Sequence, residues 1–236
     1  MRIGSKLGSV LVVVGLGCVT RAANAADEFG APKTFSVSAE RLSGVVFASE
    51  THDTAGTTVT SKRTTISFMG SALAGAVNVY SLPRIAFDVF PIKGLSLGGS
   101  LALINISANS ETEAGGISSS TDGTNIFGLL FSPRVGYAVM FNPKVGIWPR
   151  GGFTYWWTKA TPNDSSVDAS QSTSRWAVTL EAPFVISPAP HAAIYVGPTL
   201  DLGVAGSNTS KQGSTETSVD YKGTDIGLQA GLGLYF

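Results

Sequence analysis

The segment Phe127–Phe141, FGLLFSPRVGYAVMF, decides how this chain is expected to fold. Its odd-numbered residues, from Phe127 through Val135 to Phe141, are apolar along the whole length. Its even-numbered residues include several that are small or charged, namely Gly128, Ser132, Arg134, Gly136 and Ala138. Successive side chains of a β-strand point to opposite faces. The segment is therefore expected to be a strand with one continuous apolar face and one small or charged face.

The same alternation recurs along the chain and predicts eight strands. We expect them at residues 35–48, 79–90, 95–107, 124–141, 144–159, 173–186, 191–206 and 223–236. Short connections at 91–94, 142–144 and 187–190 alternate with long ones, rich in Ser, Thr, Asn and Gly, at 49–78, 108–123, 160–172 and 207–222. Short turns at one end and long loops at the other are typical of membrane barrels. The sequence thus predicts an all-β fold, an eight-stranded antiparallel up-and-down transmembrane β-barrel.

The charged residues of these strands fall on the face that is not apolar. As a solvent-facing surface, that face would be unusually rich in Gly, Ala and Ser, so we place it in a barrel lumen. An eight-stranded interior is just wide enough for side chains, and unpaired charge there is costly. We expect a lumen ion network that plugs the barrel, and a narrow path for ions or small solutes is the alternative. Its members are Arg84, Asp88, Arg134, Arg150, Arg175, Glu181, Asp201 and Asp225.

Composition and the N-terminus indicate an exported protein. Sixteen basic residues balance sixteen acidic ones among 236, which gives no reason to expect nucleic acid as a partner. MRIGSK, a short apolar run and Ala23-Asn24-Ala25 together predict a signal peptide at 1–25. A periplasmic N-terminal lead at 26–34 and the barrel at 35–236 are expected to follow. Cys18, the single cysteine, is removed with the signal. We therefore expect no disulfide, and neither a metal nor a cofactor.

Aromatic residues gather near the ends of the expected strands. Such residues form two girdles at the membrane interfaces of barrels. The expected girdle residues are Phe90, Phe141, Tyr155, Trp157 and Trp176. Trp156 has inward parity, and a carbohydrate platform is the alternative role for it.

The C-terminal sequence GLQAGLGLYF ends in Phe236, with Leu234 and Leu232 at the preceding alternate positions. This pattern resembles the assembly signal of outer-membrane barrels, although Leu234 stands where an aromatic residue is common. The whole mature chain resembles a small barrel of the OmpA/OmpX-like superfamily. The resemblance implies a monomer in outer-membrane lipid, inserted by the barrel assembly machinery, with its long loops outside the cell. It implies no particular chemistry, and the loop ligand is unknown.

Candidate catalytic groups are weak. Ser96 lies in a G-x-S-x-G match, GLSLG, but that motif needs a strand, a tight turn and a helix, whereas this segment continues as a strand. His52 and Asp53, with Ser49 or Thr51, are the basis for an alternative function as an outer-leaflet lipid acyltransferase or hydrolase. We expect a structural or surface-interaction role, not an enzyme. A soluble, lipocalin-like barrel is a third class, and it would need the apolar faces inside.

Three further features remain open at this stage. Asp122, Asp164 and Asp168 are candidate calcium ligands, but their spacing does not match an EF-hand loop, so solvated loops are expected. The segment Arg63–Ser81 either extends the second strand beyond the membrane or folds as a cap. Prolines inside the expected strands predict bulges or locally open hydrogen bonding, because proline has no N–H to donate. They are Pro83, Pro133, Pro149, Pro183 and Pro198.

Overall fold

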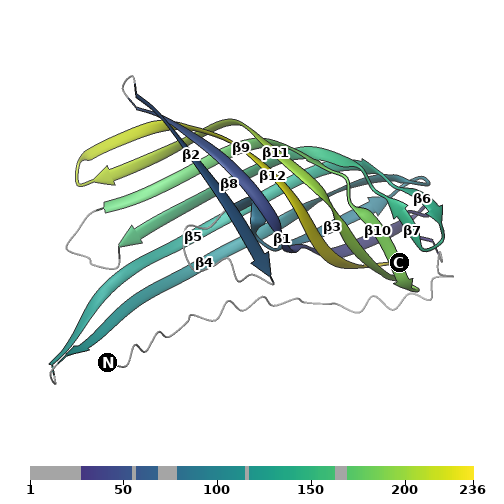
Figure 1. The fold of residues 1–236 in the computed structure, drawn as a ribbon, viewed down its shortest axis with the longest axis horizontal. Coiled ribbons are helices and arrows are strands. Elements are labelled where there is room, and N and C mark those ends of the chain that lie inside the picture. The colour runs from purple at the N-terminus through teal and green to yellow at the C-terminus, as the bar shows by residue number, and fades with distance from the viewer. Residues whose placement is uncertain (1–27, 55–56, 69–78, 115–116, 163–168) are drawn as a thin grey trace.

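The computed structural model describes residues 28–54, 57–68, 79–114, 117–162 and 169–236 (Figure 1). Strands β1, β3, β4, β5, β8, β9, β11 and β12 follow one another around a closed antiparallel barrel, and β12 pairs with β1. The predicted eight-stranded antiparallel barrel is confirmed. The strands are β1 (Thr34–Thr54), β2 (Thr57–Phe68), β3 (Arg84–Phe90), β4 (Leu95–Ala114), β5 (Ile117–Tyr137), β6 (Val139–Asn142), β7 (Val145–Ile147), β8 (Arg150–Pro162), β9 (Ala169–Glu181), β10 (Phe184–Ala189), β11 (Ala192–Gln212) and β12 (Thr215–Tyr235).

Three of the expected strands are interrupted near the short-turn end. The expected strand 124–141 is β5 followed by β6, 144–159 is β7 followed by β8, and 173–186 is β9 followed by β10. Pro149 and Pro183 lie in two of these breaks. The carbonyl oxygen of Pro149 accepts a hydrogen bond from the Tyr137 backbone N–H at 2.9 Å, and that of Pro183 accepts one from Trp148 at the same distance. The predicted local opening is therefore correct at these two prolines, while their carbonyl groups still hold the wall together.

The second expected strand, 79–90, is wrong in its extent. The wall at this position is made of two pieces, because β1 pairs with β2 over residues 43–54 and with β3 over residues 34–40. Between these pieces, the short 3-10 helix η2 (Val79–Ser81) leads into β3, and Tyr80 and Leu82 are buried inside the barrel. The part of Arg63–Ser81 up to Phe68 thus extends a strand, and its end enters the lumen.

Much of the polar sequence expected as loop is strand. The hairpin of β11 and β12 stays paired out to Gln212 and Thr215, and that of β4 and β5 out to Ala114 and Ile117. Figure 1 shows these hairpins projecting at the end opposite the C-terminus. Threonine favours extended backbone, and antiparallel pairing satisfies N–H and C=O groups that a loop would leave to water.

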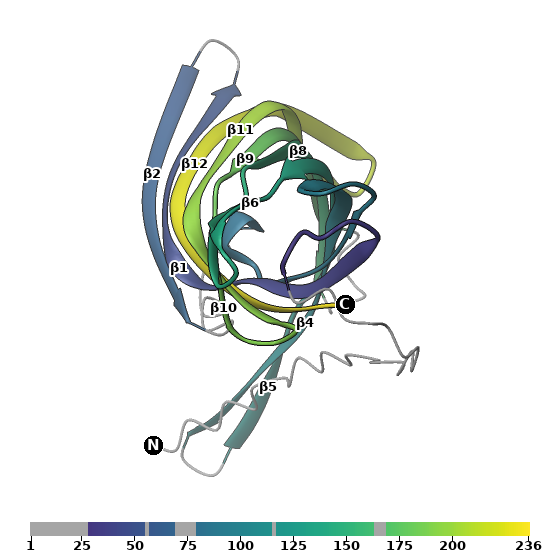
Figure 2. The ribbon, with the colours of Figure 1, turned by 90° about the vertical axis from the view of Figure 1, so that its right-hand side faces the viewer.

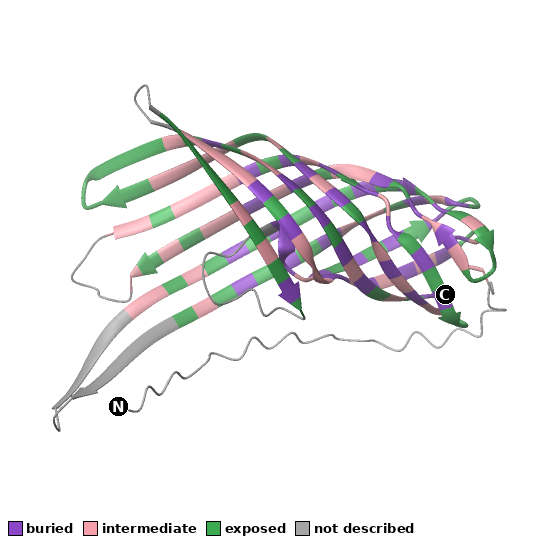
Figure 3. Cartoon of the chain, in the orientation of Figure 1, coloured by how far each residue is buried: buried purple, intermediate pink, exposed green. Residues whose placement is uncertain are grey.

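The outer face of the barrel wall is apolar and its inner face carries the charged residues, as the segment Phe127–Phe141 predicts. Val135 is 50% exposed and Leu180 48%, whereas the neighbouring Arg134 and Glu181 are 9% and 7% exposed. Figure 3 shows this alternation along the strands. Figure 2 shows the barrel from one end, with the strands around its interior. A barrel that spans a lipid bilayer needs an apolar exterior and encloses its charged side chains, and this is the arrangement observed here. The soluble, lipocalin-like alternative is therefore wrong. No helix in the described part of the chain is long and apolar enough to cross a membrane.

Candidate functional site

The candidate functional site is the barrel lumen, which side chains fill in three layers. The layer at the short-turn end is aromatic and is centred on Phe29, whose ring lies 5.2 Å from Phe90, 5.1 Å from Trp148 and 5.5 Å from Tyr235. Phe29 precedes β1, and backbone hydrogen bonds from Gly94 to Gly30 and from Lys33 to Phe90 hold its segment in the barrel mouth. Edge-to-face ring pairs add to the burial of apolar area. The segment around Phe29 thus closes the short-turn end of the barrel.

Phe90 belongs to this inner layer, so its assignment to the girdle is wrong. Arg84, Asp88 and Phe90 are all even-numbered residues of β3 and all point inward, while Ile85 and Val89 are exposed. The alternation of β3 decides the direction of the Phe90 side chain, although Phe90 lies close to a turn. Turning Phe90 outward would need a one-residue shift of the strand, which would also expose Arg84 and Asp88.

The central layer is an ion network built around Glu40. Its carboxylate accepts hydrogen bonds from Arg134 at 2.6 and 2.8 Å and from Arg150 at 2.7 Å. Arg134 also pairs with Asp88, and Arg150 lies 2.8 Å from Glu181. Each carboxylate therefore faces at least one guanidinium, which is the arrangement that makes buried charge tolerable.

A second branch of the network runs through Arg41. Its guanidinium lies 2.9 Å from Asp201 and 2.7 Å from Glu181. Thr179 donates a hydrogen bond to Asp201 at 2.6 Å, so the aspartate has a second partner. A row of hydroxyl groups extends the network across the wall, from Thr179 to Thr154 at 2.6 Å and on to Ser132 at 2.8 Å.

Glu40 and Arg41 were not among the expected lumen residues. They are consecutive, yet each is 3% exposed, which regular alternation forbids. A bulge makes this possible: three residues of β1, between Ala39 and Ser43, lie opposite a single residue of β12, and Arg41 has a φ of 55°. The signal in the sequence was the adjacent pair of charges in SAERLSG, in an otherwise small and apolar strand.

The third layer lies toward the long hairpins and is mainly apolar. Arg175 pairs with Asp225 at 3.0 Å, and its guanidinium lies 4.4 Å from the Tyr80 ring centroid. Trp156 is 7% exposed inside this layer, so its side chain is not displayed as a carbohydrate platform. The apolar members are Tyr80, Leu82, Ala102, Ile104, Leu130, Trp156 and Ala177.

The predicted lumen residues thus all point inward, but they do not form one cluster. Asp88, Arg134, Arg150, Glu181 and Asp201 join the central network, and the Arg175–Asp225 pair lies apart from it. Arg84 is 2% exposed, and its Nε atom and one of its Nη atoms have no hydrogen-bond partner among the described residues.

Charge is balanced even so. The buried charged groups of the described residues are five arginines and five carboxylates. They are Arg41, Arg84, Arg134, Arg150 and Arg175, with Glu40, Asp88, Glu181, Asp201 and Asp225. The cavity beside the central network has a volume of about 20 Å³, which is room for about one water molecule.

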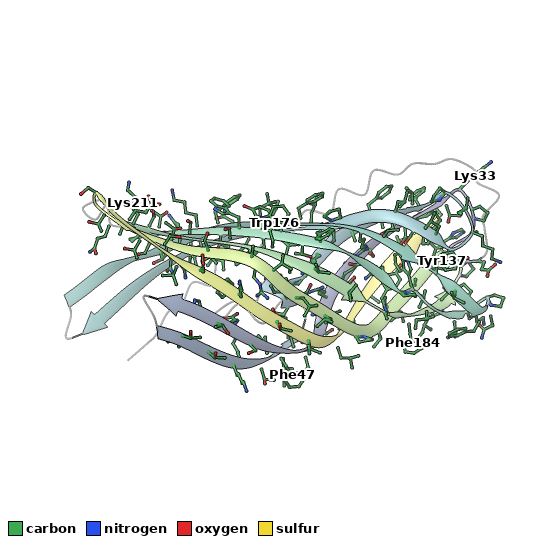
Figure 4. All side chains as sticks on the ribbon, turned by 90° about the horizontal axis from the view of Figure 1, so that it is seen from above. Lys33, Phe47, Tyr137, Trp176, Phe184 and Lys211 are labelled. Atoms are coloured by element: carbon green, nitrogen blue, oxygen red, sulfur yellow. The ribbon has the colours of Figure 1, made fainter. Side chains whose placement is uncertain are left out.

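The outer surface carries the remaining predicted residues. The Tyr155 and Trp176 rings are tilted against each other with centroids 4.5 Å apart, and the Trp157 and Phe127 ring centroids are 6.1 Å apart. Figure 4 shows Trp176 pointing away from the barrel. Phe141 is 62% exposed at the opposite end. These positions suit an interfacial girdle.

The C-terminal residues close the seam between the first and last strands. Leu232 and Leu234 are 54% and 39% exposed on the outer face of β12. The backbone N–H of Phe236 donates to the carbonyl of Phe35 at 2.9 Å, and the reverse bond is 2.8 Å. Recognition of these residues by the assembly machinery stays a prediction.

The structure describes only part of the candidate catalytic side chains. Ser96 is buried and accepts a hydrogen bond from the Trp148 indole N–H at 2.9 Å, so it holds the aromatic layer in place. The His52 ring packs on the Tyr221 ring at 4.9 Å. Asp164 and Asp168, like the side chains of Asp53 and Asp122, lie outside the described residues. Within the described residues, no group of three His, Cys, Asp or Glu is arranged for a metal.

The chain has low similarity to several outer-membrane proteins of known structure. No protein-family model matches the chain, and no curated protein matches its sequence. Among solved structures, the outer membrane protein OprG from Pseudomonas aeruginosa is 12% identical over 89% of this chain and 98% of its own, with a TM-score of 0.48. Ail, the attachment invasion locus protein of Yersinia pestis, is 15% identical over 86% and 99%, with a TM-score of 0.37. The outer membrane protease OmpT from Escherichia coli is 10% identical over 87% and 97%, with a TM-score of 0.44.

Proposed function

We propose that the protein is an integral outer-membrane barrel with a sealed lumen, which serves the cell envelope as a structural component or through its surface hairpins. The observation that carries the proposal is the filling of the interior along its length. An aromatic layer, an ion network and a mainly apolar layer lie in series. A solute would have to displace all three.

The electrostatics of the central layer also oppose conduction. Arg134 and Arg150 donate hydrogen bonds of 2.6 to 2.8 Å to the Glu40 carboxylate, and the three side chains are about 5% exposed or less. An entering ion would have to break such pairs in a region that holds about one water molecule. Separating a buried pair costs several kcal/mol, about 3–5. The narrow-channel alternative would need a path around these groups.

The surface part of the proposal rests on the projecting hairpins. Beyond the apolar belt, β11 and β12 continue as a paired, polar ribbon from Ser207 to Asp220, in which Thr209 and Ser218 are hydrogen bonded at 3.2 Å. A paired ribbon presents its side chains at fixed positions, which lowers the entropy lost when a partner binds. Closure of the barrel supports the expected monomeric state.

Planar-bilayer recording of the purified protein tests the sealed lumen. We expect no steady conductance, while a porin added to the same bilayers reports that the assay works. Steady single-channel steps of uniform size from the wild-type protein would contradict the proposal.

The lipid-enzyme alternative is tested separately. Lipid acylation is measured in cells that express the wild type or His52→Ala, with Thr217→Ala, an exposed position of β12 near the hairpin tip, as a matched surface control. We expect the same lipid profile in all three strains. A lipid modification that depends on His52 would replace the proposed role by a catalytic one.

A further inference from the structure

The outer face of strands β12, β1 and β2 is arranged as a ladder of rows. The register places Thr224, Ser49 and Lys62 opposite one another in one row. The next row toward the hairpin tips contains Lys222, Thr51 and Thr60, and the Thr51 and Thr60 hydroxyl groups are 3.4 Å apart. Two lysines and four hydroxyl residues therefore share one outward patch, which we call the Lys62–Lys222 patch.

The rows below this patch are apolar. The first contains Ile226 and Phe47, with Thr64, and the second contains Leu228, Val45 and Ile66. Phe47 is 58% exposed and Ile66 is 76% exposed, and Figure 4 shows Phe47 pointing outward. The cations thus lie at the boundary between the apolar belt and the polar hairpins, where the headgroups of the outer leaflet lie.

The two lysines are within joint reach of one ligand. Lys62 and Thr224 both face Ser49, so their strands lie two strand spacings apart, about 10 Å. Lys222 is two residues farther along β12, about 7 Å. The two Cα atoms are therefore about 12 Å apart, and two four-carbon side chains can converge on a group between them.

The charges of these lysines are not used inside the protein. Within the described residues neither lysine has a carboxylate within ion-pair distance, and Arg63 on the inward side of β2 already pairs with Glu50 at 3.3 Å. Asp220 is exposed two residues beyond Lys222, so the negative charge lies toward the hairpin tip and not toward the lipid.

We propose that the Lys62–Lys222 patch binds the phosphorylated headgroup of an outer-leaflet lipid, whose acyl chains lie along Phe47, Ile66 and Leu228. Lysine ammonium groups bind phosphate as point charges, and the threonine and serine hydroxyl groups donate further hydrogen bonds. The apolar rows beneath select a lipid over a free anion. This site lies outside the lumen, so it does not depend on whether the barrel is sealed.

Native mass spectrometry in mild detergent tests the proposal with two probes, a bisphosphorylated lipid A and the same lipid after enzymatic dephosphorylation. The test variant is Lys62→Ala/Lys222→Ala. The control is Lys144→Ala/Lys159→Ala, which removes the same charge from two exposed lysines at opposite ends of the barrel, one in the turn between β6 and β7 and one on β8 near the long hairpins. Each lysine near a charged lipid surface contributes about five-fold in affinity, so we expect binding of the phosphorylated lipid to weaken about thirty-fold in the test variant. The control is expected to change less than about two-fold, since its lysines lie apart.

Heat-modifiable gel migration checks that both variants fold, as expected for exposed side chains. Equal losses in the two variants, or no preference of the wild type for the phosphorylated probe, would overturn the proposal. Displacement of the lipid by millimolar inorganic phosphate would assign the patch to a free anion and would also overturn it.

Discussion

The substitution Glu40→Gln tests whether the ion network stabilises the barrel. Glu40 is 3% exposed and accepts hydrogen bonds from Arg134, Arg150 and Ser38. Glutamine keeps the shape but removes the charge, which leaves the five buried arginines facing four carboxylates. Removing one partner of a buried pair costs about 3–5 kcal/mol, because the remaining charge is left uncompensated.

The assay is equilibrium unfolding in urea, with the barrel in lipid vesicles and tryptophan fluorescence as the signal. Glu50→Gln is the matched control, since Glu50 pairs with Arg63 at 3.3 Å in a partly exposed position. Such a pair contributes about 0–1 kcal/mol. We therefore expect the free energy of unfolding to fall at least three times as far in Glu40→Gln as in the control.

A double-mutant cycle tests whether the loss of stability in Glu40→Gln comes from the pair with Arg150. Arg150→Gln alone removes a partner of both Glu40 and Glu181. If the pair is coupled, Glu40→Gln/Arg150→Gln is destabilised by less than the sum of the single variants. Strict additivity, or a loss below about 1 kcal/mol in Glu40→Gln, would refute the view that this buried pair stabilises the fold.

Three further predictions concern the packing of the barrel and the limits of its stable core. Phe29→Ala is expected to lower the free energy of unfolding by about 3–5 kcal/mol, because it empties the centre of the aromatic layer. Phe141→Ala, on the lipid face, should lower it much less. Equal losses in the two variants would contradict a structural role for Phe29 at the short-turn end. Gly152→Ala should prevent folding, since its Cβ would lie 2.0 Å from the Pro133 carbonyl oxygen. Gly213→Ala, at a positive φ but with open space around it, should cost only about 1 kcal/mol, and a folded Gly152→Ala barrel would refute the packing argument. Replacing residues 207–220 by an Asn-Gly turn should leave heat-modifiable migration intact, because these residues lie beyond the apolar belt; loss of folding would show that the hairpin belongs to the stable core.

The alternation of apolar with small or charged residues was sufficient to predict the barrel, its eight strands and the sense of its faces. Arg134 and Val135 illustrate why: neighbouring side chains of a strand must face different surroundings, so the pattern of a single segment reports both. The same parity places Arg84, Asp88 and Phe90 together inside, so for Phe90 the alternation is a better guide than nearness to a turn.

Other features depend on contacts between distant segments. The sequence could not show that Glu40 and Arg41 both face inward, because a bulge depends on how β1 pairs with β12. It could not place Phe29 in the barrel mouth, because Phe29 precedes the first expected strand. It could not place Tyr80 beneath Arg175 either, because the expected strand 79–90 begins as a short helix inside the barrel. Periodicity is a local property that each strand carries by itself. Contacts between strands far apart in the chain determine which strands pair and where a bulge forms. They also determine which side chains close the ends of the lumen.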